Sequence, residues 1–149
     1  MKKHNIIFTV LAYAGDEDLI LENILCLLDA VPEASITVID GFCDPCSPRT
    51  RTLAEIMGVR WKSSAWPRHE SPTSLLGMEK ILSEMLALSK EDDDVLVKID
   101  PDTALLDARE LYEFARSDKA LWACGCPDTK IFGNLFALKA NAAQYLLSN

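Results

Sequence analysis

The strongest constraint on the fold is a regular alternation of strand-like and helix-like apolar patterns along the chain. Residues 5–13 form an apolar run with several β-branched members, which is typical of a strand buried on both faces. Apolar side chains then recur at helical spacing from Ile20 to Val31, and Pro32 ends this pattern. Strand and helix patterns continue to alternate afterwards. Because helices that link neighbouring strands leave those strands parallel, we predict a three-layer α/β/α domain with a mostly parallel sheet.

The later elements are indicated by short apolar runs and by residues that favour helix starts. We expect strands at 36–39, 59–61, 95–99 and 121–124, with a further apolar run at 135–138. Helices are expected to begin near Ser47, Ser71, Asp107 (with Glu110 at capping-box spacing) and Asn141, and Gly58 is expected to end the second helix. Since ligands bind at the carboxyl ends of the strands in such sheets, functional residues are expected near Tyr13, Asp40 and Asp100.

The composition limits the classes of partner. The chain has 149 residues, which suits one domain over 1–149, and 49% of them are hydrophobic. Acidic residues outnumber basic ones by 23 to 15, so the formal net charge is −8. This charge gives no general attraction to nucleic acid or to an anionic membrane. No apolar run approaches the ~20 residues of a transmembrane helix, and an odd number of cysteines, five, argues against a disulfide framework.

The first residues have two interpretations. Two lysines, an apolar stretch and the sequence Ala12–Tyr13–Ala14 are similar to a secretory signal with its cleavage site. The apolar stretch is short for a signal, however, and the helix pattern that follows at once needs a partner strand. We therefore favour a buried first strand in a cytoplasmic protein.

The most informative polar residues are two aspartates directly after the apolar strand at 95–99. Pro101 separates Asp100 from Asp102, fixes its own backbone angle and biases Asp100 toward an extended conformation. Two clustered carboxylates repel each other, and a divalent cation relieves that repulsion. Oxygen ligands suit Mg²⁺ or Mn²⁺, which can also bridge a diphosphate. The alternative is a turn with two solvated acids, but the position after a long apolar strand favours a metal site.

Three further side chains are candidates on local grounds, each with a structural alternative. Lys98 alternates with Asp100, so both should lie on one face of the strand. It either pairs with an acid or a phosphate, or packs its stem on the sheet with its amine in water. Asp40 either accepts hydrogen bonds from a base or a ribose, or forms a turn before Gly41. Tyr13 either presents its ring to a base or lines the core.

Several of these segments resemble GT-A-type glycosyltransferases. The strand from Ile6 to Tyr13 with its acidic helix start, and the segment 38–41 with Asp40, resemble the opening of family-two glycosyltransferases. Residues 96–103 resemble the Lys-x-Asp-x-Asp strand end of galactosyltransferase and Fringe-like enzymes, and residues 133–138 with Tyr145 and Leu146 resemble their later glycine–aromatic segment. The resemblance spans nearly the whole chain and implies a GT-A-like (nucleotide-diphospho-sugar transferase) fold with a short C-terminal part.

The resemblance implies a metal-dependent glycosyltransferase that uses a UDP- or GDP-sugar with Mn²⁺ or Mg²⁺. Asp102 would coordinate the metal, and Asp100 would contact the ribose or reach the metal through a water molecule. Asp40 with the region of Ala12 and Tyr13 would hold the base. No general base is assigned, since Asp128 is the nearby candidate and an ordinary loop acid is its favoured interpretation.

Other interpretations stay open. One is a nucleotide-sugar-binding or regulatory module without turnover, or a minimal enzyme completed by a second copy or a partner chain. The segment 100–105 is also similar to the Asp-x-Asp loop of haloacid-dehalogenase-type phosphatases, which usually carry it on their first strand. Four cysteines, Cys43, Cys46, Cys124 and Cys126, offer thiolates for zinc or are simply buried or idle. Arg68 and His69 belong either to a loop over the donor site or to a plain surface loop.

Overall fold

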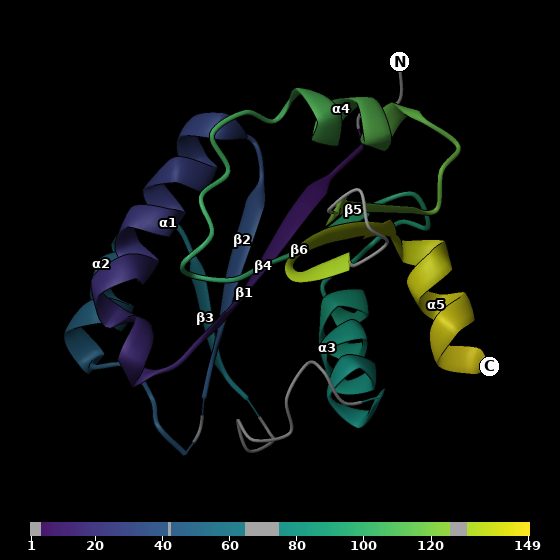
Figure 1. The fold of residues 1–149 in the computed structure, drawn as a ribbon. Coiled ribbons are helices and arrows are strands. Elements are labelled where there is room, and N and C mark those ends of the chain that lie inside the picture. The colour runs from purple at the N-terminus through teal and green to yellow at the C-terminus, as the bar shows by residue number, and fades with distance from the viewer. Residues whose placement is uncertain (1–3, 42, 65–74, 126–130) are drawn as a thin grey trace.

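The structure is a computed structural model that describes residues 4–41, 43–64, 75–125 and 131–149, and it shows a central sheet with helices on both faces (Figure 1). The strands are β1 (Ile6–Ala12), β2 (Ser35–Asp40), β3 (Arg60–Ser63), β4 (Val95–Ile99), β5 (Leu121–Gly125) and β6 (Ile131–Lys139). The helices are the 3₁₀ turn η1 (Ala14–Asp16) and the α-helices α1 (Glu17–Ala30), α2 (Pro48–Ile56), α3 (Leu75–Ala87), α4 (Arg109–Arg116) and α5 (Ala140–Ser148).

The sheet confirms the predicted α/β class. Its six strands have the order β3-β2-β1-β4-β6-β5. β1 is parallel to both of its neighbours, β2 and β4, and β2 is parallel to β3, whereas β6 is antiparallel to β4 and β5. The carboxyl ends of β1, β2 and β4 therefore meet at one edge, where Ala12 lies beside Asp40 and Val10 beside Ile99. This edge is where a sheet of this kind places its ligands.

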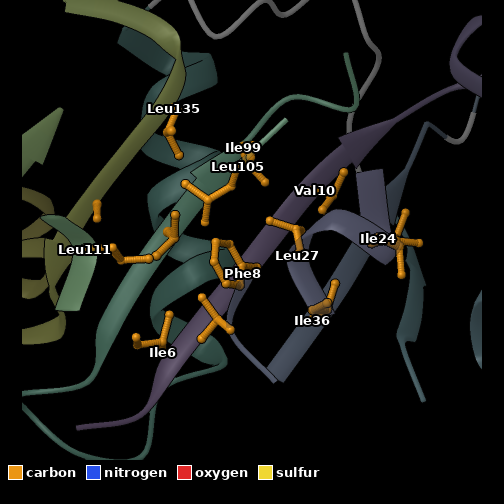
Figure 2. Packing of buried hydrophobic residues seen from close by; sticks show 14 of the residues in the cluster. Ile6, Phe8, Val10, Ile24, Leu27, Ile36, Ile99, Leu105, Leu111 and Leu135 are labelled. Atoms are coloured by element: carbon orange, nitrogen blue, oxygen red, sulfur yellow. The ribbon is translucent and has the colours of Figure 1, made fainter. Parts of the chain in front are cut away.

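The larger hydrophobic cluster lies between the sheet and α1, α2 and α4. Phe8 in β1 is fully buried, and Figure 2 shows it near Leu27 of α1 and Leu111 of α4. Alternate residues of β1 and β4, such as Val10 and Ile99, point into the same cluster. Burial of these side chains anchors α1 against the strands whose ends carry the candidate residues.

The opposite face of the sheet is covered by α3 and α5. Ile7, Leu96 and Met85 belong to its cluster. A polar row interrupts this face, since Thr9 pairs in register with Thr37 on one side and with Lys98 on the other, and all three side chains are buried. The face that carries Lys98 is therefore the face on which Asp100 follows two residues later.

Helix ends confirm two of the predicted signals. Ser47 is the N-cap of α2 and its side chain accepts a hydrogen bond from the Thr50 amide at 3.4 Å, with Pro48 in the first helical position. Gly58 follows α2 with φ of 84°, a conformation that favours glycine. The predicted start at Ser71 lies outside the described residues.

The other two helices begin near the predicted positions, but their predicted side-chain caps are wrong. Helix α4 has Ala108 at its N-cap, and the Asp107 carboxylate instead accepts from the Arg109 amide at 2.9 Å. Helix α5 begins at Ala140, because the amides of Ala140 and Asn141 donate to the carbonyls of Asp94 and Asp92. Carbonyls from another segment satisfy the first turn of α5, so it needs no side-chain cap. Within the described residues, none of the helices combines the length and apolar content needed to cross a bilayer.

Candidate functional site

The two predicted acids lie on a turn at the carboxyl end of β4. The Thr103 amide donates to the Asp100 carbonyl at 3.0 Å, which closes a turn over the four residues from Asp100 to Thr103. Pro101 is buried at the second position of this turn, where its fixed backbone angle is favourable. The Asp102 side chain is exposed, and 30% of the surface of the Asp100 side chain is exposed. Both carboxylates are thus held on a short, closed segment.

Lys98 and Asp100 lie on one face of the sheet, as their spacing predicts. The Lys98 ammonium donates to Oδ1 of Asp100 at 2.5 Å, and the Lys98 side chain is fully buried. The interpretation in which the amine reaches water is therefore wrong. Because an unpaired buried ammonium would be costly, this ion pair fixes one oxygen of Asp100 against the sheet.

Asn23 is a residue of this region that the sequence did not single out. It lies in the interior of α1 with 4% of its surface exposed. Its Nδ2 donates to the Asp100 carbonyl at 3.3 Å and to the Thr103 carbonyl at 2.5 Å. A polar residue on the otherwise apolar inner stripe of a helix was the available signal.

The segments that follow β1 and β2 are tied to each other. The Ala14 amide donates to the Asp44 carbonyl at 2.9 Å, and the Gly41 amide donates to the Ala12 carbonyl at 2.8 Å. The Glu17 carboxylate at the start of α1 accepts from the Ser47 amide, and this interaction lowers the pKa of Glu17. The structure therefore joins the ends of β1 and β2 into one platform beside the acidic turn.

Asp40 is an internal anchor of this platform. Its side chain is buried, with 4% exposed, and both oxygens accept from the Cys46 amide at 3.0 and 3.2 Å. Oδ2 also accepts from the indole N–H of Trp61 at 3.2 Å. Gly41 follows in the chain, so the turn-forming interpretation of Asp40 describes this geometry. Its direct contact with a base stays a prediction.

Cys46 lies inside the same platform as a protonated thiol. Its Sγ donates to the Tyr13 carbonyl at 3.2 Å. Burial, followed by the nearby Asp40 carboxylate, raises the pKa of Cys46 to about 12. Metal-bound cysteine is a thiolate, so this environment disfavours Cys46 as a zinc ligand. Cys126 of the thiolate hypothesis lies outside the described residues.

Tyr13 stands where β1 leaves the sheet. Its backbone amide is held by the Asp16 carboxylate at 3.2 Å, and its side chain is partly exposed. The ring lies directly over Gly15, since a Cβ added to Gly15 would come within 2.3 Å of Tyr13 Cε2. Glycine is therefore required at position 15 for this ring position. Ala12, the preceding residue, is buried.

The acidic turn carries oxygen donors of the kind that bind a divalent cation. Among the described residues, no group of three or more His, Cys, Asp and Glu side chains is arranged to hold a metal ion. Mg²⁺ and Mn²⁺ are commonly held by one or two carboxylates together with water and phosphate oxygens. The exposed Asp102 and the partly exposed Asp100 offer such hard oxygen donors, so the pair fits a cation shared with a phosphate ligand. Arg68, His69 and Asp128 lie outside the described residues.

The amino-acid sequence matches no protein-family model, and no curated protein is significantly similar to it. The fold, however, is similar to those of solved glycosyltransferases. The mannosyltransferase PcManGT from Pyrobaculum calidifontis, in complex with GDP-Man and Mn²⁺, gives a TM-score of 0.67 at 15% identity, over 97% of this chain and 47% of that chain. The galactosyltransferase LgtC, in complex with donor and acceptor sugar analogs, gives 0.63 at 16% identity, over 93% and 59%.

A third glycosyltransferase, GlyE of Streptococcus pneumoniae, gives a TM-score of 0.51 at 13% identity, over 98% of this chain and 38% of that chain. The protein therefore spans between 38% and 59% of the length of these three enzymes. At such identities the likeness concerns the fold. The chain has the GT-A-like fold that its sequence motifs implied.

Proposed function

We propose that this protein transfers a glycosyl group from a nucleotide-diphosphosugar, with a UDP- or GDP-sugar as donor. The observation that carries the proposal is the acidic turn after β4, which presents the Asp102 carboxylate to solvent at the carboxyl edge of the sheet. The GT-A-like fold supports it, since PcManGT was solved with GDP-Man and Mn²⁺. The position of Asp100 after the fourth strand also favours transfer over a haloacid-dehalogenase-type phosphatase.

In this proposal Asp102 and Asp100 hold Mn²⁺ or Mg²⁺ against the donor diphosphate. The ion, when bound, would neutralise charge that develops on the leaving diphosphate. The Lys98 ammonium donates to Oδ1 of Asp100 at 2.5 Å. The other carboxylate oxygen of this partly exposed side chain is left for the ligand. Asp102, whose side chain is exposed, is the direct ligand in this assignment.

The base of the nucleotide is assigned to the platform formed by the ends of β1 and β2. The partly exposed Tyr13 ring forms its surface, and the buried Ala12 precedes it in the chain. Asp40 supports the platform from inside through the Cys46 amide and the Trp61 indole. Because Asp40 is only 4% exposed, a direct bond from its carboxylate to the base would require the platform to open, so we expect an indirect role.

Thermal unfolding with UDP and with GDP, each with and without Mn²⁺, tests the proposal. A ligand at 100 times its Kd stabilises by about 2.7 kcal/mol, which raises Tm by several degrees. We expect a metal-dependent rise for at least one nucleotide. Asp102→Asn should remove that rise, whereas Asp29→Asn, a matched change of an exposed acid on α1, should keep it.

A donor hydrolysis assay separates an enzyme from a binding module. Release of UDP or GDP from the corresponding sugar nucleotide, lost in Asp102→Asn, supports transfer. Metal-dependent binding without turnover for any acceptor supports the module instead. A lack of response to every nucleotide with Mn²⁺ would contradict both forms of the proposal.

A further inference from the structure

Asn23 connects the interior of α1 to both ends of the acidic turn. Its Nδ2 donates to the carbonyls of Asp100 at 3.3 Å and Thr103 at 2.5 Å. The Thr103 amide closes the same turn on the Asp100 carbonyl at 3.0 Å. One side-chain amide thus bridges the first and last residues of the segment that carries Asp102.

Placing an asparagine at position 23 costs free energy, because the position is buried inside a helix. Its helical neighbours on the inner face, Ile20, Ile24 and Leu27, are fully buried apolar residues. Asparagine lowers helix propensity, and a buried amide costs free energy unless its polar atoms are hydrogen-bonded. Among the described residues, Asn23 Oδ1 is buried without a partner. The two hydrogen bonds to the acidic turn offset this cost.

We infer that Asn23 is a positioning residue for the candidate metal site. It holds the backbone from Asp100 to Thr103 in the closed turn before any cation arrives, so that the two carboxylates need little reordering on binding. Groups that orient metal ligands without touching the metal commonly change its affinity by 10–100-fold. Preorganisation of this kind lowers the entropic cost of binding. The metal part of the inference rests on the proposed function, whereas the hold on the turn does not.

The turn itself provides a readout that needs no metal. The Thr103 amide donates within the turn, so its hydrogen exchange reports how often the turn opens. In Asn23→Leu, which keeps a similar volume and removes the donor, we expect this amide to exchange at least about tenfold faster. Leu27→Ala is the matched control, because Leu27 is buried on the same helix and only its cavity is expected to lower stability.

Mn²⁺ affinity, measured by the loss of the free-ion electron paramagnetic resonance signal in the presence of GDP or UDP, gives the second readout. We expect Asn23→Leu to weaken Mn²⁺ binding about tenfold and Leu27→Ala to leave it unchanged at an equal or larger loss of Tm. Asn23→Ser, which is too short to bridge both carbonyls, serves if Asn23→Leu does not fold. It should show the same direction in both readouts.

The outcomes separate this inference from the proposed function. Wild-type protein that binds no Mn²⁺ contradicts the proposed function, and the exchange of the Thr103 amide then still decides whether Asn23 holds the turn. Wild-type protein that binds Mn²⁺, with equal affinity in the Asn23 variants, overturns the metal part of the inference. Unchanged Thr103 exchange in the variants relative to Leu27→Ala overturns the positioning role as a whole.

Discussion

Aspartates lie at the ends of both β2 and β4, at the same edge of the sheet, yet they differ in burial and in hydrogen bonding. Asp40, the last residue of β2, is 4% exposed and accepts hydrogen bonds from Cys46 and Trp61. After β4, Asp100 is partly exposed and shares one oxygen with Lys98, and Asp102 is exposed. The first carboxylate supports the protein's own loop, and the second region offers oxygens to a ligand.

This difference shows that an acid at a strand end is not by itself a ligand site. What decides its role is whether donors of the protein already satisfy it. Buried polar groups are almost always hydrogen-bonded, and Asp40 meets that demand with a backbone amide and an indole. The acidic turn instead satisfies its backbone, through Asn23 and Thr103, and leaves the Asp102 side chain outside.

The largest expected effect concerns the reactivity of the Cys46 thiol, which lies close to Asp40. With a pKa of about 12 instead of the ordinary 9.0, Cys46 has roughly a thousandfold smaller thiolate fraction at pH 8. We expect iodoacetamide to modify the exposed Cys43 much faster than the buried Cys46, as measured by peptide mass spectrometry. Comparable rates at the two cysteines would show that the β2 loop is open.

The same thiol predicts a direction for alkaline unfolding. Its folded pKa lies above the unfolded value, so its contribution to stability is present below pH 9 and is lost as the pH rises toward about 12. We expect Cys46→Ala to lose less stability over that range than the wild type in urea titrations. An identical alkaline slope for both proteins contradicts the raised pKa.

Next in size is the removal of the Asp40 carboxylate. Asp40→Ala leaves the Cys46 amide and the Trp61 indole without their acceptor, which should cost about 2–4 kcal/mol in urea unfolding. Asp44→Ala in the same loop is the control, since Asp44 is exposed, and it should change stability by less than about 0.5 kcal/mol. Equal losses of unfolding free energy in Asp40→Ala and Asp44→Ala would contradict a structural role for the buried acid.

A smaller loss is expected when Asp100 can no longer neutralise the buried ammonium. Asp100→Asn removes the charge that faces Lys98, and because Asp100 is 30% exposed we expect a cost of about 1–2 kcal/mol. In the double variant with Lys98→Met the loss should be smaller than the sum of the single losses. Strict additivity in this double-mutant cycle would mean that the ion pair does not contribute.

The smallest effect on stability is expected at the ligand-facing acid. Asp102 is exposed, so Asp102→Asn should change the free energy of unfolding by less than about 0.5 kcal/mol, as should Asp29→Asn. The same Asp102 variant should lose the Mn²⁺-dependent response to nucleotide. A marked loss of stability in Asp102→Asn would place this side chain among the structural acids, beside Asp40.

Much of the architecture was accessible from local patterns. The apolar runs at 5–13 and 95–99 correspond to β1 and β4, and the Ser47–Pro48 signal marks the start of α2. The placement of Lys98 and Asp100 on one face also follows from strand periodicity, and their ion pair confirms it. These features depend on neighbours in sequence, which is why they were predictable.

Other features depend on segments far apart in the chain. Asn141 resembled a helix cap, but the carbonyls of Asp92 and Asp94 satisfy the first turn of α5. The hydrogen bonds from Asn23 to the acidic turn join residues that are 77 and 80 positions apart in the sequence. Asn23 interrupts the apolar stripe of α1, but the partner segment of neither contact is indicated by local sequence.

The sequence by itself determined the alternating strands and helices, because hydrophobic periodicity is a local property of the chain. It also determined that aspartates lie at the carboxyl ends of β2 and β4. Only the tertiary structure decided which of these carboxylates is hydrogen-bonded within the protein and which is exposed to solvent. The physical reason is that a carboxylate's availability depends on burial and on donors such as the Cys46 amide, the Trp61 indole and the Lys98 ammonium, which folding brings to it.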